Sequence, residues 1–393
     1  MMKIGIQIER FDPLAGGAEK YTDEMVRGLL ARGHKVCVFA REARSLPAGA
    51  HFQAVPVAGW FRWQKDRSFA QNADRLAEAA QLDVLLSTGK TYAMDVIQPH
   101  GGSVLHSQQQ NIARIPSGCL RALKALFNHV NPRQVRARLQ ESLLYRRRPL
   151  PHVVAVSRMV ADDLRRYYSV PEERLHVIYN GVDLQRFHPA SLAARRAPAR
   201  ERFAIDRNAL VFALVAHNFK LKGVAELIQA TARLHTAERP LCVVVAGKAR
   251  PRRYQKMARD LGCDSRFRFA GLQEAVDDVY AAADVYIHPT WYDPCSLVVL
   301  EALAAGLPVI TTRCNGASEI MTDGCEGFLL DTPADIELLT NHMATFFETE
   351  RLGPMGRQAR QLAEQFPWDR NIEEMLRVLE LAAGENRRNR SAS

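Results

Sequence analysis

Residues 283–312 read ADVYIHPTWYDPCSLVVLEALAAGLPVITT. The β-rich residues 284–288 predict a strand, and residues 308–312 predict a second strand after a Gly-Leu-Pro turn. Between the two strands, Ser296 can cap a helix over residues 297–305, which the next glycine can end. A strand, a helix and a strand in this order predict a parallel sheet with helices packed on it.

The start of this helix is a predicted phosphate site. The first N–H groups of a helix have no acceptor inside it, and the positive end of its dipole lies there. Ser296, Leu297 and Val298 therefore frame a predicted cradle for a diphosphate. Two carboxylates flank it, Asp293 in the preceding loop and Glu301 about one turn into the helix. Because a carboxylate cannot neutralise a phosphate, both are better suited to accept hydrogen bonds from sugar hydroxyls, and the pattern predicts a nucleotide-sugar site.

This segment resembles the donor-binding signature of glycosyltransferase family 4, a family of retaining enzymes with the GT-B fold. The usual family pattern is two glutamates separated by seven residues, and here Asp293 stands at the first position and Glu301 at the second. The sequence NGASE at residues 315–319 adds to the resemblance. The resemblance implies that Glu301 holds the ribose and Asp293 the sugar hydroxyls. A capped helix with two solvated acids is the alternative interpretation.

Composition limits the class of protein. The 393 residues are too many for one ordinary core, and no stretch reaches the roughly 18 apolar residues of a membrane span. The N-terminus runs into a strand without a signal-peptide pattern, and seven scattered cysteines without a C-x-x-C pair predict reduced thiols in a cytosol. Since no D-x-D sequence and no metal-ligand spacing occur, we expect no metal and no cofactor beyond a nucleotide-sugar co-substrate.

Predicted strands alternate with helices in two series. The first series comprises residues 3–9, 35–40, 83–87, 94–98, 152–156 and 175–179, and the second comprises residues 209–216, 241–246, 266–270, 284–288, 308–312 and 327–330. Together with the resemblance, this alternation predicts the α/β GT-B architecture, two Rossmann-like doubly wound parallel-sheet domains facing across a cleft.

The predicted domain boundaries follow from composition. Residues 1–188 form the predicted N-terminal acceptor-binding domain, and residues 203–367 form the predicted donor-binding domain. The Arg/Ala/Pro-rich residues between them read as a linker. The resemblance implies that a helix over residues 368–383 packs back on the first domain, and the polar residues 384–393 predict a disordered tail.

Two pieces of the first domain are candidate ligand contacts. Gly16 and Gly17 lie between a predicted strand and helix, where glycine allows close backbone approach and the helix N-terminus attracts phosphate. A simple tight turn is the alternative, and the pattern is not the G-x-G-x-x-G of dinucleotide-binding proteins. His100 follows a predicted strand and precedes two glycines. The resemblance implies that the glycine loop reaches the donor phosphates and that His100 lies beside the transferred sugar.

The loop after the first strand of the second domain reads HNFKLKG from His217. Family members usually carry an arginine several residues before a Lys-Gly pair, and both cations hold the diphosphate. Lys222 matches the lysine, whereas His217 occupies the arginine position, so either His217 or Lys220 supplies a second charge. A cation here can offset the charge that grows on the leaving diphosphate. Gly271 and Leu272 fall at the strand end where the family's backbone contacts to the base lie.

A basic stretch suggests where the acceptor binds. Residues 114–148 carry nine basic side chains and one acidic one, a net charge of +8 out of +10 for the whole chain. Leu120, Leu123, Leu126 and Phe127 recur at helical spacing within it. Basic amphipathic helices bind anionic membrane surfaces or phosphates. A solvated helix packed on the first domain is the alternative, and nucleic acid is not expected because no aromatic interleaving accompanies the charge.

The resemblance, which covers nearly the whole chain, implies a retaining, metal-independent hexosyltransferase that uses a UDP-sugar, most simply UDP-glucose. His100, Lys222, Asp293 and Glu301 are the candidate catalytic residues. The layout is similar to that of the lipopolysaccharide core glucosyltransferases of the family, so we expect an anionic glycolipid acceptor and a cytoplasmic protein, peripheral on the inner face of the membrane. The alternatives are a hexosyl- or mannosyltransferase acting on a phospholipid or soluble acceptor, and a catalytically silent sugar-nucleotide-binding protein.

Overall fold

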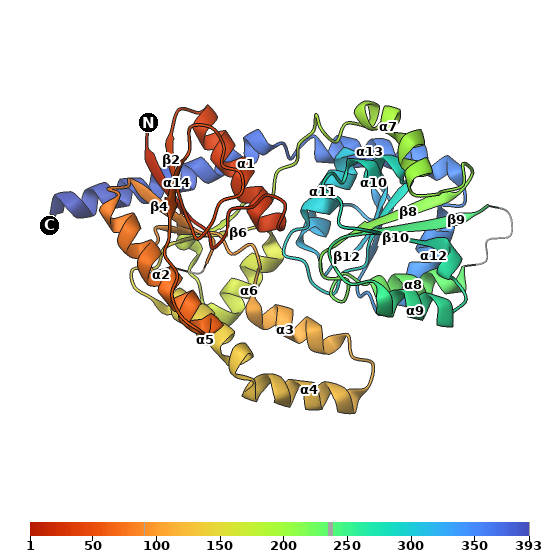
Figure 1. Ribbon diagram of the computed structural model, residues 1–393, viewed down its shortest axis with the longest axis horizontal. Helices are drawn as coiled ribbons and strands as arrows, with labels where there is room; N and C mark the ends of the chain where they lie inside the picture. Colours follow the sequence, from red (N-terminus) through yellow and green to blue (C-terminus); the bar gives the residue numbers. More distant parts are fainter. Residues whose placement is uncertain (90, 235–238, 393) are drawn as a thin grey trace. The chain divides into compact units, whose positions relative to one another are not determined.

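A computed structural model of the protein describes residues 1–89, 91–234 and 239–392. These residues form two α/β units (Figure 1). The first unit comprises Met1–Gln109, Ser117–Asn180 and the C-terminal segment from Trp368, and the second comprises Gln110–Pro116 and Gly181–Pro367. Each unit has its own sheet and its own hydrophobic core.

The first unit contains a seven-stranded parallel sheet with the strand order β3-β2-β1-β4-β5-β6-β7. Its strands are β1 (Lys3–Gln7), β2 (Lys35–Ala40), β3 (His51–Ala54), β4 (Val84–Ser87), β5 (Val96–Ile97), β6 (His152–Ala155) and β7 (Leu175–Val177). The α-helices that begin in this unit are α1 (Gly17–Ala31), α2 (Arg62–Ala79), α3 (Val104–Ala113), α4 (Gly118–Val130), α5 (Pro132–Arg146), α6 (Arg158–Tyr168) and α14 (Trp368–Ala392).

The second unit contains a six-stranded parallel sheet with the strand order β10-β9-β8-β11-β12-β13. Its strands are β8 (Leu210–Val215), β9 (Leu241–Ala246), β10 (Phe267–Gly271), β11 (Val285–His288), β12 (Val309–Thr312) and β13 (Gly327–Leu330). Its α-helices are α7 (Pro189–Arg202), α8 (Val224–Arg233), α9 (Arg252–Asp260), α10 (Asp277–Ala282), α11 (Leu297–Ala304), α12 (Ile336–Thr345) and α13 (Leu352–Ala363).

Both sheets are doubly wound. Numbered along the chain, the second sheet has the order 3-2-1-4-5-6 of Rossmann domains, and the first sheet has the same order with a seventh strand added at its end. The order reverses between β1 and β4 in the first unit and between β8 and β11 in the second. Ligands of such sheets bind beyond the carboxyl ends of the strands at this reversal. The predicted fold class, two Rossmann-like parallel-sheet domains, is confirmed.

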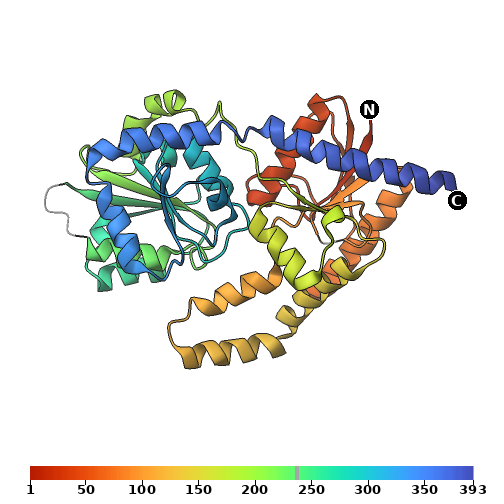
Figure 2. The same ribbon diagram turned by 180° about the vertical axis from the view of Figure 1, so that it is seen from behind.

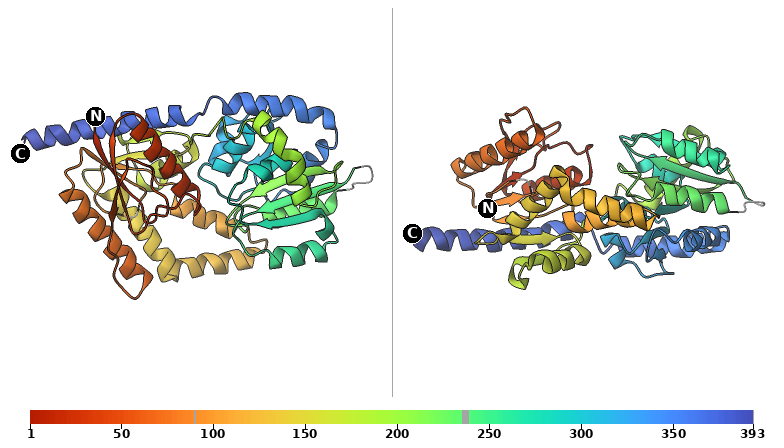
Figure 3. Two further views of the ribbon diagram at one scale, coloured as in Figure 1. Left: turned by 45° about the horizontal axis from the view of Figure 1, so that its top comes forward. Right: turned by 90° about the horizontal axis from the view of Figure 1, so that it is seen from below.

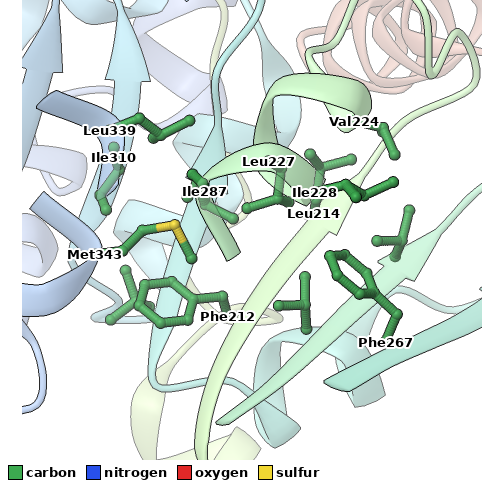
Figure 4. Close-up of a cluster of buried hydrophobic side chains, with 14 of the residues drawn as sticks. Phe212, Leu214, Val224, Leu227, Ile228, Phe267, Ile287, Ile310, Leu339 and Met343 are labelled. Atoms are coloured by element: carbon green, nitrogen blue, oxygen red, sulfur yellow. The ribbon is translucent and has the colours of Figure 1, made fainter. Parts of the chain in front are cut away.

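Alternate side chains of the strands build the core of the second unit (Figure 4). Leu210, Phe212 and Leu214 of β8 are fully buried in it, next to Leu227 and Ile228 of α8. The intervening residues of β8 are also buried, because helices cover both faces of the sheet (Figure 3). A strand buried on both faces reads as a continuous apolar run. That is why this strand could be predicted from the sequence.

In the first unit, α14 lies along α1 and the sheet (Figure 2). The Tyr21 hydroxyl on α1 donates a hydrogen bond to Oδ1 of Asn371 on α14 at 2.9 Å. The two helices approach closely at Gly28, where an added Cβ would lie 2.0 Å from Cδ1 of Ile372. The C-terminal helix is therefore an integral part of the first unit.

The predicted linker is wrong, because residues 189–202 form the helix α7. Several arginines of α7 form ion pairs or hydrogen bonds with other segments of the second unit. Arg200 donates to Oδ2 of Asp284 at 2.9 Å and to the carbonyl of Ala282, and Arg195 pairs with Asp278 at 2.7 Å. The polar composition of the segment thus reflects ion pairs with α10 and the start of β11. Consequently the chain passes to the second unit after Asn180 rather than after residue 188.

The predicted disordered tail is also wrong over residues 384–392, since α14 continues to Ala392, and residue 393 lies outside the described residues. Glu385 accepts a hydrogen bond from Arg174 at 2.7 Å, and Asn386 donates one to the carbonyl of Asp83 at 3.2 Å. These contacts with distant segments order a stretch whose own composition is that of a tail. The short edge strand β3, which pairs with β2, was not predicted.

The basic stretch folds into the helices α4 and α5, which contact each other, and α4 lies away from the sheet of its unit (Figure 1). Leu120, Leu123, Leu126 and Phe127 on α4 are 51% to 63% exposed. The alternative in which this apolar row packs on the first domain is therefore wrong. The row faces solvent in the part of the chain that the structure describes.

A buried carboxylate joins α3, α5 and α6. Glu141 on α5 accepts hydrogen bonds from the amide of Val104, 3.0 and 3.1 Å from its two oxygens, and from the hydroxyl of Tyr168. Burial raises the pKa of Glu141 to about 7, which the bonds from Tyr168 and Val104 oppose and the nearby Asp163 reinforces. The carboxyl group binds its proton more tightly in the folded chain than in the unfolded one.

We predict that Glu141→Gln changes the pH dependence of stability. Because the folded-state pKa is raised, the contribution of Glu141 is complete below its ordinary pKa of 4.5 and is lost as the pH rises through about 7. The free energy of unfolding of Glu141→Gln, relative to wild type, should rise by on the order of 2–3 kcal/mol between pH 4 and pH 8. Urea titrations at several pH values measure this difference. The exposed substitution Glu364→Gln is the control, and equal slopes for the two variants would contradict the prediction.

Candidate functional site

The candidate site lies at the carboxyl ends of β8 and β11, where the strand order of the second sheet reverses. The loop after β8 runs to Lys222 and Gly223, and α8 starts at the next residue. The loop after β11 runs from Pro289 to Ser296, and α11 starts immediately after it. Lys222, Asp293 and Ser296, which the sequence singled out, are thus on two neighbouring loops.

A partly buried ion pair joins these loops. Nζ of Lys222 lies 2.6 Å from Oδ2 of Asp293 and also donates to the carbonyl of Tyr292 at 3.0 Å. Nε2 of His288, at the end of β11, lies 3.3 Å from the same carboxylate oxygen. The side chains of Lys222 and Asp293 are 18% and 14% exposed, so water screens the pair weakly. The sequence predicted both residues as ligand contacts but did not predict that they contact each other.

The charge state of the site follows from this pairing. Burial alone would raise the pKa of Asp293, but the Lys222 ammonium and the His288 ring outweigh it and hold this pKa well below its usual range. Burial lowers the pKa of His288, although the hydrogen bond to Asp293 opposes the shift. At neutral pH the site therefore contains an ammonium, a carboxylate and a neutral imidazole.

Backbone contacts hold the two loops together. The carbonyl of Leu221 accepts hydrogen bonds from the amide of Trp291 at 2.8 Å and from the hydroxyl of Thr290 at 3.0 Å. Gly223 has a φ of +73°, and a Cβ at this position would lie 1.8 Å from the carbonyl oxygen of Pro289. Only glycine fits there, which explains why glycine follows Lys222.

The helix after the second loop begins where it was predicted, but its cap differs. Ser296 is the N-cap residue of α11, yet its hydroxyl makes no capping hydrogen bond. The hydroxyl oxygen is buried and has no hydrogen-bond partner among the described residues. The amides of Leu297 and Val298 open the helix, where a helix offers N–H groups without an internal acceptor. A buried hydroxyl and free helix amides fit an anionic oxygen.

Asn315 positions this helix start. Its side-chain oxygen accepts hydrogen bonds from the amides of Ser296 at 3.2 Å and of Ala317 at 3.1 Å. Its side-chain nitrogen donates to the hydroxyl of Thr311 at 3.2 Å, and Asn315 is fully buried. The downstream NGASE sequence thus contributes an asparagine that fixes the loop.

Glu301 lies on α11 and is 4% exposed. Its Oε2 accepts a hydrogen bond from the Tyr280 hydroxyl at 2.7 Å, and the same hydroxyl lies 3.2 Å from the carbonyl of Val298. Tyr280 therefore connects Glu301 to the first turn of α11. The sequence pointed to Glu301 through its spacing from Asp293, but gave no signal for Tyr280.

The remaining predicted residues of the second unit are more exposed. His217 and Lys220 are exposed in the loop after β8. Gly271 and Leu272 are exposed at the end of the edge strand β10, and Gly271 has a φ of +68° that favours glycine. Lys222 and Asp293, in contrast, are only 18% and 14% exposed.

Three predicted residues belong to the first unit. Gly16 precedes α1 with extended backbone angles that any residue adopts, and Gly17 is the first residue of α1. His100 follows β5, and its ring lies 4.5 Å from that of Tyr21 between centroids. Burial lowers the pKa of His100 to about 4, so its imidazole is neutral at physiological pH.

Three residues that the sequence did not assign have clear roles in this geometry. His288 hydrogen-bonds Asp293, Tyr280 hydrogen-bonds Glu301, and Asn315 holds the start of α11. A histidine that ends a predicted strand just before the loop of Asp293 was an available signal for His288. Among the described residues, no group of three or more His, Cys, Asp or Glu side chains could hold a metal ion.

The second sheet has a cation, two carboxylates and an open helix start where its strand order reverses. With the doubly wound sheet of the first unit, these features define a two-domain Rossmann-like α/β protein with a candidate ligand site in its second unit. Comparison with models of known protein families narrows this class to glycosyltransferases. Residues 15–186 match the model of glycosyltransferase family 4, and residues 196–365 match that of glycosyl transferases group 1. The chain therefore consists of two glycosyltransferase domains, one in each matched range.

The curated relatives of the chain are named for different transfer reactions. The lipopolysaccharide glucosyltransferase WaaG of Escherichia coli K12 is 24% identical over 338 residues, 82% of this chain and 84% of the relative. A D-inositol 3-phosphate glycosyltransferase of Corynebacterium kroppenstedtii is 31% identical over 217 residues, 53% of this chain and 48% of the relative. The match with the second relative thus spans about half of that protein's length.

Solved structures share the fold over nearly the whole chain. The crystal structure of WaaG aligns with a TM-score of 0.81 at 20% identity and covers 96% of this chain and 99% of its own. The Anabaena protein HepE in complex with UDP-glucose aligns with a TM-score of 0.73 at 20% identity and covers 96% and 100%. At this level of identity, the alignments establish the fold.

We predict that the Lys222–Asp293 pair stabilises the second unit. Lys222→Met leaves the mostly buried carboxylate of Asp293 without this partner, so it should lower the free energy of unfolding by about 3 kcal/mol. Lys222→Met combined with Asp293→Asn should recover most of this loss, because the unpaired charge is gone. Chemical denaturation of the full chain at pH 7 measures the cycle, and the exposed Lys220→Met is the control.

The pH must be kept above the ordinary Asp pKa of 3.8 in these measurements. The depressed pKa of Asp293 means that its contribution is complete above this value and declines only in stronger acid. Additive losses in the double variant would show that the two side chains do not interact in solution.

Proposed function

We propose that the protein is a retaining, metal-independent glycosyltransferase that transfers a hexose, most simply glucose, from a UDP-sugar to a membrane-associated anionic glycolipid such as a lipopolysaccharide core. The observation that carries the proposal is the placement of Lys222, Asp293 and the open start of α11 at the reversal point of the second sheet. A cation and unpaired helix amides suit a diphosphate, and two adjacent carboxylates suit hydroxyl groups.

Each candidate site residue of the second unit then has a separate role. Lys222 and the amides of Leu297 and Val298 bind the diphosphate, and the buried hydroxyl of Ser296 donates to one of its oxygens. Glu301, held by Tyr280, accepts hydrogen bonds from the ribose. Asp293 accepts from hydroxyls of the hexose, with its position fixed by Lys222 and His288. His217, Lys220, Gly271 and Leu272 provide further donor contacts around the buried residues.

The reaction breaks the bond between the anomeric carbon and the terminal phosphate oxygen. The acceptor hydroxyl forms its new bond on the same face of the sugar, its proton passes to the leaving phosphate, and UDP departs. Lys222 offsets the negative charge that grows on the diphosphate as the bond breaks. His100 in the first unit stays neutral near pH 7, so it contributes a hydrogen bond to the hexose rather than a charge. Gly16 and Gly17 are the proposed backbone contacts of that unit to the donor phosphates.

Two comparisons support the choice of donor. HepE, a structural neighbour, binds UDP-glucose in its crystal structure, and the relative WaaG is named a glucosyltransferase. The names of other relatives favour a second candidate, a transferase for another sugar or a phosphorylated acceptor. The MMP α-(1→4)-mannosyltransferase of Mycolicibacterium hassiacum is 27% identical over 97% of this chain and 98% of its own length. An inositol phosphate or phospholipid would also suit the basic stretch.

The surface of α4 supports a membrane-bound acceptor. Its exposed apolar row, Leu120, Leu123, Leu126 and Phe127, lies within the stretch of net charge +8. Apolar side chains flanked by cations match the interface of an anionic membrane. No helix among the described residues is long and apolar enough to cross a bilayer. We therefore propose peripheral attachment through α4, on the cytoplasmic face.

The donor is tested by hydrolysis without an acceptor, over a panel of nucleotide sugars and in the presence of EDTA. Release of UDP from UDP-glucose would support the proposed donor and the independence from metal. Release from GDP-mannose alone would favour the second candidate. If no sugar nucleotide is either hydrolysed or bound in a titration, the proposed site is wrong.

We predict that Glu301→Gln lowers turnover by at least about a hundredfold and also weakens UDP binding, because an amide accepts fewer hydrogen bonds from the ribose. Tyr280→Phe keeps the carboxylate but frees it to move, so KM for the donor should rise about tenfold with a smaller change in kcat. Steady-state kinetics and calorimetric UDP titration measure both. Unchanged UDP affinity in Glu301→Gln would contradict the assigned role, and wild-type Tm values exclude misfolding.

We predict that Leu123→Glu combined with Leu126→Glu lowers vesicle binding. Both positions are exposed, so the fold should be retained, whereas two carboxylates oppose insertion and attraction to an anionic surface. Sedimentation with phosphatidylglycerol-containing vesicles at physiological salt should show a loss of roughly tenfold or more in the partition coefficient. Donor hydrolysis without vesicles is the control and should be unchanged. Equal binding of the variant and wild type would refute attachment through α4.

A further inference from the structure

A second exposed apolar surface in the first unit is independent of α4. The loop between β3 and α2 and the first turn of α2 carry the sequence Ala-Gly-Trp-Phe-Arg-Trp from Ala58, here called the aromatic loop. Trp60 is 94% exposed, Phe61 is 64% exposed and Trp63 is 43% exposed. Large aromatic side chains dominate cores and interfaces because burying them removes much apolar area from water. Three of them exposed within four positions indicate a binding surface.

The backbone of the aromatic loop is held in one conformation by its own polar contacts. Oε1 of Gln64 accepts hydrogen bonds from the amides of Trp60 and Phe61, both at 2.9 Å, and the hydroxyl of Ser68 accepts one from the amide of Ala58 at 3.0 Å. Gly59 has a φ of +127°, and a Cβ there would lie 2.5 Å from Cβ of Gln64. The loop is thus fixed against α2 while the side chains of Trp60 and Phe61 face solvent.

Charge around the aromatic loop is basic. Arg62, Lys65 and Arg67 in the first turns of α2 are exposed. The guanidinium carbon of Arg136, on α5, lies 5.2 Å from the ring centroid of Trp63, a cation–π distance. This contact connects the aromatic loop with the basic helices α4 and α5.

We propose that the aromatic loop is a second membrane anchor, in which Trp60 and Phe61 enter the interface of an anionic bilayer and the neighbouring cations bind lipid headgroups. An indole has an apolar ring and a polar N–H group, and tryptophan is therefore enriched at the level of the headgroups. Exposed cations within one Debye length of the surface add attraction to anionic lipid. An anionic bilayer can accept the exposed aromatic rings and the surrounding basic side chains, and it needs no binding pocket of matching shape.

The proposal deepens the peripheral attachment proposed above and rests on it, but it needs no assumption about donor or acceptor. One weak membrane contact gives marginal binding, and stable attachment usually takes two signals. The two anchors differ in chemistry: α4 offers an aliphatic row, whereas the loop offers aromatic rings on a fixed backbone.

The first test is sedimentation of the full chain with phosphatidylcholine vesicles that contain one-third phosphatidylglycerol. Trp60→Ala combined with Phe61→Ala should lower the partition coefficient by roughly tenfold or more, because two aromatic side chains no longer leave water. Leu261→Ala combined with Leu381→Ala removes two other apolar side chains, each 45% exposed, and is the matched control with unchanged binding. Tm and donor hydrolysis without vesicles should equal those of wild type for both variants.

The second test places Trp60 in the membrane directly. The chain has four tryptophans, so the signal of Trp60 is the difference between wild type and Trp60→Phe, which keeps an aromatic anchor. Vesicles with lipids brominated near the headgroup should quench this difference signal more strongly than lipids brominated deep in the chains.

Each outcome decides the proposal. If the Trp60 signal is unquenched while the protein sediments with vesicles, the loop is not an anchor and attachment through α4 stands alone. If wild type does not bind vesicles at all, both membrane contacts are wrong, whereas donor hydrolysis still tests the enzymatic part. A change in oligomeric state of the Trp60→Ala, Phe61→Ala variant without vesicles would assign the loop to a contact between copies and overturn the proposal.

Discussion

One partly buried ion pair joins the two loops that form the candidate site of the second unit. Lys222 and Asp293 are far apart in sequence, yet Nζ and Oδ2 lie 2.6 Å apart because parallel strands bring the loops after β8 and β11 to one sheet edge. A buried charge is tolerated only when it is paired, so each residue fixes the other. The tight contact of Gly223 with Pro289 and the hydrogen bonds of the Leu221 carbonyl follow from the same approach of two loops.

The pairing also suits the chemistry proposed for the site. Charged groups that a protein holds in place before the substrate binds need little reorganisation during the reaction. Lys222 and Asp293 neutralise each other, while the Ser296 hydroxyl and the first amides of α11 offer hydrogen-bond donors to an anion. The first unit differs in its surface, since α4 and the aromatic loop expose apolar side chains that are not part of its core. The proposed chemistry and the proposed membrane attachment thus depend on different segments of the chain.

Much of the fold could be predicted from the sequence. Strands buried on both faces read as apolar runs, and β2, β9 and β13 have the predicted bounds. The errors occurred where polar residues find distant partners. Residues 189–202 read as a linker because their arginines could not be paired with Asp278 and Asp284 in advance, and the tail read as disordered without its contacts to Arg174 and Asp83. The strand β3 is short and lies at a sheet edge, so its pattern was weak.

By itself, the sequence determined the alternation of strands and helices, the order of the two series and the residues at the carboxyl ends of the strands, because these depend on local periodicity and turn chemistry. Only the tertiary structure decided which of those residues touch. Lys222 meets Asp293 across 71 residues, and Tyr280 meets Glu301 across 21. The tertiary structure also decided that the apolar row of α4 faces solvent. An amphipathic pattern predicts that a helix has an apolar face, but what covers this face depends on packing between distant segments.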